Sequence, residues 1–219
     1  MKGLDGFQAE LVSPQLTTGR GPGAYDSLLL ALRELGGDTH VLTVLDKAWR
    51  DRDFPGRFAR PLLILTALRF RALTSEGYLL APETLADAVA PDLQDRVRDA
   101  FHDPLLAELL ATRSLQSRDP GRGLGWGLIA TALRLPNRGF GLVQFEAGAG
   151  LELVVDLTTT SFRMGAEQAM GLDFPTPHIR LGLDSAPLDV RDDAVVKWLQ
   201  ACIWPGQPKR LERLTNCME

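Results

Sequence analysis

Apolar residues recur at three- and four-residue spacing as far as residue 135, and this periodicity predicts a series of amphipathic helices. The clearest pattern covers 24–35, where leucines form one stripe and Gly36-Gly37 ends the run. The segment 61–68 is apolar on most faces, which predicts a helix buried at the centre of this part of the chain. The same periodicity predicts further helices at 41–49, 82–90, 91–101, 104–112 and 124–135.

The first 23 residues lack a sustained period and contain two prolines and several glycines. We therefore expect residues 1–23 to form an irregular arm that either drapes over the helical body or is disordered. The helical region is expected to span 24–136. Asp38 or Thr39 stands where a side chain can cap the helix predicted at 41–49.

The period changes beyond residue 136. Short apolar runs at 140–145 and 178–184 are suited to strands, whereas the segment 151–162 fits two structures. It can form a helix after a glycine turn, or a strand that pairs back on 140–145 as a hairpin. Helical periodicity returns at 192–203 and 208–216. We therefore expect a small α/β unit over 137–219, and the fold class of the chain is α/β.

The composition narrows the classes of function. A formal net charge of −4 and a pI of about 5.5 argue against general affinity for nucleic acid or an anionic membrane. The amino terminus has no signal-peptide pattern, and no segment has the roughly 18 consecutive apolar residues that a membrane span needs. Cys202 and Cys217 make neither a disulfide framework nor a metal-ligand spacing. We expect a cytoplasmic protein without a metal site.

The run 140–145 leads into Glu146-Ala147-Gly148-Ala149-Gly150, an acid followed by a glycine-rich turn. In open α/β sheets such a junction binds nucleotide-containing cofactors, because glycines let the backbone approach the ligand. Asp184 ends the second strand-like run, where an acid can bind ribose hydroxyls. Both features also fit a site without a ligand, since glycine turns and aspartates at strand ends are common turn chemistry.

Several stretches carry a resemblance to known proteins. They are Ala111–Gln116, Leu142–Asp156, Asp184–Val190, Trp198-Leu199 with Trp204-Pro205, and Arg210-Leu211. Together they resemble an uncharacterised bacterial family, the domain-of-unknown-function family 2332. The resemblance implies a helical amino-terminal region followed by a Rossmann-like sheet similar to that of class I S-adenosylmethionine-dependent methyltransferases. It implies S-adenosylmethionine as the cofactor, bound by Glu146, Gly148, Gly150 and Asp184. The family itself has no assigned reaction.

The chain departs from the pattern of this family around the glycine turn. Gln144 aligns with the family's acid, and Glu152 aligns with an asparagine and replaces the third glycine of a methyltransferase cofactor loop. A carboxylate at position 152 would repel the carboxylate of a bound methionine moiety. Family members also continue past Glu219, so the later strands of the sheet are expected to be missing and the sheet to be truncated.

Two functions stay open at the level of the sequence. The first is a methyltransferase-like protein that binds S-adenosylmethionine, for which no catalytic base or methyl acceptor can be named. The second is a non-catalytic scaffold that has lost cofactor binding and forms a homodimer by covering an exposed edge strand. Asp189 and Asp192 are interpreted as caps of the helix at 192–203, and Trp198 and Trp204 as core or subunit-contact residues.

Overall fold

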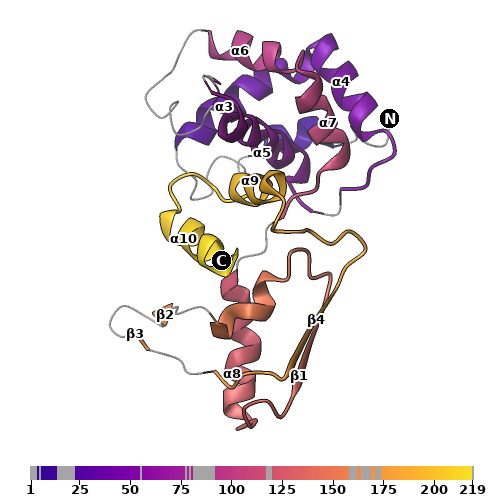
Figure 1. Cartoon of the computed structure of the whole chain (residues 1–219). Coiled ribbons are helices and arrows are strands. Elements are labelled where there is room, and N and C mark those ends of the chain that lie inside the picture. The colour runs from indigo at the N-terminus through magenta and orange to yellow at the C-terminus, as the bar shows by residue number, and fades with distance from the viewer. Residues whose placement is uncertain are drawn as a thin grey trace. The chain divides into compact units, whose positions relative to one another are not determined.

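The structure is a computed structural model of the whole chain (Figure 1). The residues that it describes are 4, 6–13, 23–54, 56–76, 78, 80, 92–116, 120–157, 162–163, 169–170 and 174–218. They form a helix-rich arrangement with a small parallel sheet, which confirms the α/β class. The helix expected at 82–90 lies outside the described residues.

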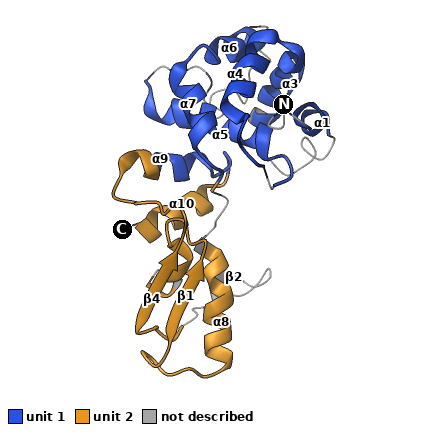
Figure 2. Ribbon diagram, turned by 90° about the vertical axis from the view of Figure 1, so that its right-hand side faces the viewer, with its two compact units in different colours: residues 1–115, 197–206 blue, residues 116–196, 207–219 orange. Residues whose placement is uncertain are grey.

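The chain divides into two compact units, coloured separately in Figure 2. The first consists of residues 1–115 and 197–206, and the second consists of residues 116–196 and 207–219. The sequence analysis placed a boundary after residue 136 instead. The division lies earlier because α8 (Leu124–Ala132) packs against η3 (Leu151–Leu157) within the second unit.

The first unit is built from helices. In chain order these are α1 (Phe7–Leu11), α3 (Gly23–Glu34), η1 (Leu35–Gly37), α4 (Thr39–Trp49), α5 (Ala59–Thr74), α6 (Leu93–Ala100) and α7 (Pro104–Thr112). Helix α9 (Asp193–Ala201) crosses from the second unit into the first. The helices predicted at 24–35, 41–49, 61–68 and 104–112 are confirmed, and Asp38 caps α4 by accepting a 3.0 Å hydrogen bond from the Val41 amide.

Helix α5 forms the centre of this unit, as its nearly uniform hydrophobicity predicts. Every residue from Leu63 to Phe70 is buried, including Arg69, whose guanidinium donates a 3.1 Å hydrogen bond to the Gln200 carbonyl. Trp49 at the end of α4 is fully buried, and its indole N–H donates a hydrogen bond to the Leu110 carbonyl. The Arg69 guanidinium and the Trp49 indole therefore each have a hydrogen-bond partner of the kind that burial requires.

The prediction of an irregular amino-terminal arm is wrong for residues 7–11, which form α1. Phe7 and Leu11 are both buried, and the Phe7 ring meets Trp49 edge-on with ring centroids 5.5 Å apart. Gln8 Nε2 donates a 2.8 Å hydrogen bond to the Gly36 carbonyl. A helix of five residues is too short to show a periodic pattern, and packing on the core stabilises it.

The second unit combines short helices with two small sheets. Its elements are η2 (Pro120–Gly123), α8, β1 (Gly141–Phe145), η3, β2 (Phe162–Arg163), β3 (Ala169–Met170), β4 (Ile179–Leu183) and α10 (Pro208–Met218). Strands β1 and β4 pair in parallel, and β2 and β3 pair antiparallel. The strands predicted at 140–145 and 178–184 are thus confirmed. Helix α8 runs alongside the β1/β4 pair (Figures 1 and 2).

The hairpin alternative for 151–162 is wrong for its first seven residues. Leu151–Leu157 forms the 3-10 helix η3, and β1 takes β4 as its partner. The leucines at 151 and 153 are buried, so their alternation reflects packing of a helical turn and not the pleat of a strand. The chain therefore runs from strand through glycine turn to helix, and Thr158–Ser161 lie outside the described residues.

Candidate functional site

The parallel pairing of β1 and β4 creates a shared strand end. Phe145 and Leu183 are register partners, so Glu146 and Asp184 each follow the last residue of neighbouring strands. In α/β proteins the carboxyl ends of parallel strands are the edge at which ligands bind. The pairing thus brings together the two candidate acids, which are 38 positions apart in the sequence.

The turn between β1 and η3 has an unusual backbone. Glu146, Gly148 and Gly150 all have positive φ, with values of 53°, 59° and 71°. Glycine adopts this left-handed region without a steric penalty, whereas a residue with a Cβ such as Glu146 is uncommon there. The two glycines are therefore required by the path of the turn, independently of any ligand.

Asp184 binds this turn directly. Its Oδ2 accepts a 2.7 Å hydrogen bond from the Gly148 amide, and its Oδ1 accepts a 2.8 Å bond from the Ala186 amide. The Ala147 amide also donates to the Leu183 carbonyl at 3.1 Å. Two of the turn's amides are thus used in holding the turn on β4. Asp184 acts as the anchor of the glycine turn, which sequence analysis had not anticipated.

Close contact between the turn and β4 depends on a third glycine. An added Cβ at Gly182 would lie 2.9 Å from the Ala147 Cβ, closer than side chains tolerate. Ala147 itself is buried. Gly182 therefore lets the turn pack on the sheet. Glycine inside a strand often marks such a close approach of another segment.

Two polar pairs join the strands to η3, Gln144 with Glu152 and Arg180 with Asp156, and these four residues are called the inner polar cluster. Gln144 Nε2 donates a 2.8 Å hydrogen bond to Glu152 Oε2, and Arg180 pairs with Asp156 and donates a 3.0 Å bond to the Leu153 carbonyl. Gln144 Oε1, Glu152 Oε1 and Asp156 Oδ1 are buried and have no hydrogen-bond partner among the described residues. Sequence reasoning missed this cluster because only the packing of η3 on the strands assembles it.

The inner polar cluster fixes the position of Glu152, the residue predicted to repel the carboxylate of the cofactor. Glu152 was expected to repel a methionine carboxylate, but its side chain turns to Gln144, with one oxygen fully buried. Both oxygens of the Asp184 carboxylate, the group expected to bind ribose hydroxyls, accept hydrogen bonds from backbone amides.

The other candidate residues have structural roles. Asp192 Oδ1 accepts a 2.8 Å hydrogen bond from the Ala194 amide at the start of α9, as expected for a cap. Asp189 is paired with Arg191, and this hydrogen bonding lowers the pKa of Asp189 to about 2. Trp198 is buried in the first unit and donates to the Ser114 carbonyl at 3.0 Å, while Trp204 meets Tyr25 edge-on.

Two histidines far apart in the sequence lie together in the first unit. The rings of His40 and His102 stack with centroids 4.0 Å apart. No group of three or more His, Cys, Asp or Glu side chains in the described part of the chain could hold a metal ion. Across the same residues, every helix is too short or too polar to traverse a membrane.

Comparison with known proteins places the chain in a family. No curated protein and no solved structure matches it. Residues 24–219 match the family of uncharacterised proteins conserved in bacteria, DUF2332, and this match covers all of the sheet, the glycine turn and Asp184. The chain therefore belongs to DUF2332.

Proposed function

We propose that the second unit binds a nucleotide-type cofactor, S-adenosylmethionine, at the junction of β1 and β4. The observation that carries this proposal is the parallel pairing of Phe145 with Leu183, which puts Glu146 and Asp184 at one strand end. The strand, glycine turn and helical segment follow one another in the order that such sites use. The order of β1, the glycine turn and η3, with β4 parallel to β1, supports a Rossmann-like site.

The roles of the site residues follow from their chemistry. Asp184 would accept hydrogen bonds from ribose hydroxyls, and Gly148 and Gly150 would let the cofactor approach the backbone. The Glu146 carboxylate, which follows the last residue of β1, would orient the cofactor. S-adenosylmethionine supplies an activated methyl group when bound. The contribution of this chain would be to position the cofactor and the acceptor of that group.

Isothermal titration calorimetry of the full chain with S-adenosylmethionine tests the proposal. We expect saturable heat for the wild type and binding weakened about tenfold in Asp184→Asn, since a charged hydrogen-bond acceptor is lost. Asp189→Asn is the matched control because Asp189 is an exposed aspartate that pairs with Arg191. A wild-type titration without heat, in protein shown to be folded by thermal melting, would overturn the proposal.

A second function, self-association, is favoured by the outer face of the β1/β4 sheet. Five large apolar side chains on this face are exposed to solvent, namely Val143, Phe145, Ile179, Leu181 and Leu183. Phe145 is 73% exposed. Parallel sheets are almost always covered on both faces, and contiguous exposed apolar surface marks interaction sites. We therefore propose that two copies of the chain cover this outer face in a homodimer.

Light scattering coupled to size-exclusion chromatography tests self-association. The double variant Phe145→Thr/Leu181→Thr keeps residues suited to strands but removes apolar surface, so we expect it to shift a dimer to a monomer. Leu30→Gln is the control, since Leu30 is 57% exposed on α3 in the other unit. A wild-type chain that is monomeric at all concentrations tested would exclude this second function.

A further inference from the structure

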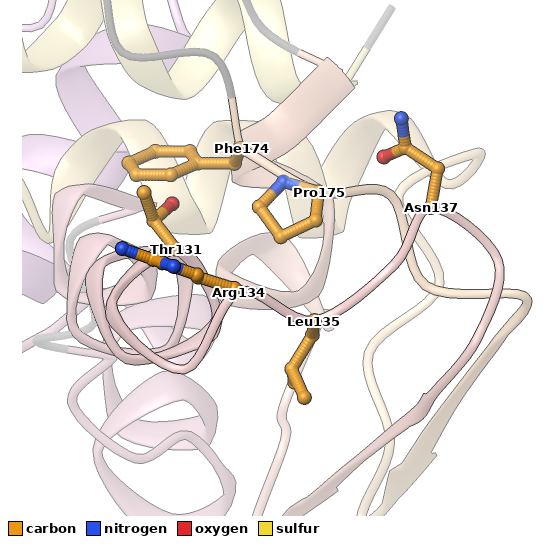
Figure 3. A pocket seen from close by; sticks show the side chains of 6 residues that line it. All are labelled: Thr131, Arg134, Leu135, Asn137, Phe174 and Pro175. Carbon is orange, nitrogen blue, oxygen red and sulfur yellow. The ribbon is translucent and has the colours of Figure 1, made fainter.

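A pocket in the second unit lies at the end of α8, away from the glycine turn in sequence. It has a volume of about 310 Å³ and is lined by Thr131, Arg134, Leu135, Asn137, Phe174 and Pro175 (Figure 3). Figure 3 shows Phe174 and Pro175 on one side, with Arg134 and Thr131 facing them. This volume is at the lower end of the range of small-molecule sites.

Two polar side chains of the pocket, Arg134 and Asn137, offer donors, whereas the Thr131 hydroxyl donates its hydrogen to the Gly127 carbonyl at 2.9 Å. Arg134 contributes a guanidinium, and among the described residues no acidic side chain lines the pocket or pairs with it. Asn137 Oδ1 accepts a 2.9 Å hydrogen bond from the Thr176 amide, which leaves its NH₂ group as the donor at the other end of the side chain. A guanidinium suits an anion, above all a carboxylate, with which it can form two parallel hydrogen bonds.

The opposite side of the pocket is apolar, and the ring of Phe174 on this side is closely packed. Phe174 is buried, and an added Cβ at Gly127 would lie 2.7 Å from its ring, so Gly127 provides the space in which the ring sits. The ring of Trp126 also lies beside Phe174, with the two ring centroids 6.1 Å apart. Phe174 and Pro175 therefore form a fixed apolar surface suited to a flat ligand.

The backbone at Arg134 points to a role for its side chain. The Leu135 amide donates to the Ala130 carbonyl and the Arg134 amide donates to the Thr131 carbonyl, which is the Schellman pattern at the end of α8. Arg134 occupies the left-handed position of this motif with φ 53°, where glycine is the usual residue. A strained residue that lines a pocket is a candidate for function.

We propose that this pocket binds a small organic carboxylate with a flat apolar body. The carboxylate would pair with the Arg134 guanidinium, and the apolar body would lie against Phe174 and Pro175. The site is separate from the strand-end junction, and its ligand does not depend on the function proposed for that junction.

Benzoate is the probe, measured by calorimetry or ligand-observed NMR with the full chain. We expect benzoate to bind, and benzamide, its neutral counterpart, to bind about tenfold or more weakly because it cannot form the charged pair. Inorganic phosphate tests charge without a ring and is expected to bind more weakly than benzoate. Absence of benzoate binding, equal binding of benzamide, or phosphate binding as tight as benzoate would each overturn the proposal.

The variant Arg134→Gly separates binding from folding. Glycine relieves the left-handed strain, so the melting temperature is expected to stay level or rise while benzoate binding falls about tenfold or more. Arg138→Gly is the matched control, because Arg138 also has positive φ (57°), is exposed, and does not line the pocket. Its benzoate affinity is expected to equal that of the wild type.

A further variant covers the case in which Arg134→Gly fails to fold. Arg134→Lys keeps the positive charge but loses the two-pronged guanidinium, so it is expected to bind benzoate more weakly than the wild type. Unchanged benzoate binding in either folded Arg134 variant, or equal loss in Arg138→Gly, would show that the guanidinium of Arg134 does not hold the ligand.

Discussion

The amide nitrogen of Gly148 lies 2.7 Å from Oδ2 of Asp184, and this hydrogen bond joins the glycine turn after β1 to the end of β4. The other carboxylate oxygen accepts from the Ala186 amide in the turn that follows β4. One side chain thus fixes two turns at the strand end. A substitution at Asp184 is consequently expected to alter the conformation of both turns.

Removing this carboxylate is expected to destabilise the second unit. Asp184→Ala leaves two backbone amides without their acceptor, which we expect to cost about 1–3 kcal/mol in the free energy of unfolding. Asp184→Asn keeps an acceptor and is expected to lose less. Urea denaturation measures the free energies, and hydrogen exchange at the Gly148 amide reports the local opening. The control Asp51→Ala removes an exposed aspartate of the first unit and should change neither; a loss as large as in Asp184→Ala would refute the anchoring role.

The helices of the first unit could be predicted because their sequence signals are local. Leucine spacing predicts α3, a proline start and an apolar run predict α7, and Asp38 is one of the two residues predicted to cap α4. Helix α1 was missed because its stability comes from Phe7 packing on Trp49, a residue distant in sequence. Local patterns reveal elements that are long enough to show a hydrophobic period.

A buried glycine in α8 allows a direct test of the pocket wall. Gly127→Ala would bring a methyl group to 2.7 Å from the Phe174 ring, whereas Gly125 in the same helix has nothing within 4 Å of an added Cβ. Gly125→Ala is expected to stabilise by about 1 kcal/mol through helix propensity. Gly127→Ala is expected to be less stable than Gly125→Ala by about 1–3 kcal/mol because the ring must move. Thermal and urea unfolding compare the two variants, and equal stabilities would contradict the contact.

The candidate site illustrates the limit of sequence reasoning. Glu146, Gly148, Gly150 and Asp184 could be singled out because each stands at the end of a strand-like run. Their hydrogen bonds could not be predicted, because they depend on the parallel pairing of β1 with β4. The choice of helix or strand for 151–157 was equally open, since it is decided by which strand pairs with β1.

The inner polar cluster leads to a prediction for a buried ion pair. The Asp156 side chain is 1% exposed and pairs with Arg180, so Arg180→Met leaves a carboxylate buried without its partner. We expect a cost of about 3 kcal/mol in the free energy of unfolding. The double variant Arg180→Met/Asp156→Leu removes both charges and is expected to be more stable than Arg180→Met alone. Urea unfolding of the wild type, both single variants and the double variant gives the coupling energy; additive costs would show that the pair contributes nothing.

The cap of α4 should make the first unit sensitive to acid. The hydrogen bond from the Val41 amide, with a smaller effect of Arg98, holds the pKa of Asp38 below its ordinary value of 3.8. Because the folded-state pKa is the lower one, the stability that Asp38 contributes is present above pH 3.8 and is lost as the pH falls through the folded-state pKa. Asp38→Asn keeps a capping side chain but cannot titrate, so we expect a smaller acid-induced drop in the urea midpoint than in the wild type. Asp92→Asn is the control, since Asp92 at the start of α6 makes no capping hydrogen bond; an equal effect of both substitutions would argue against the cap.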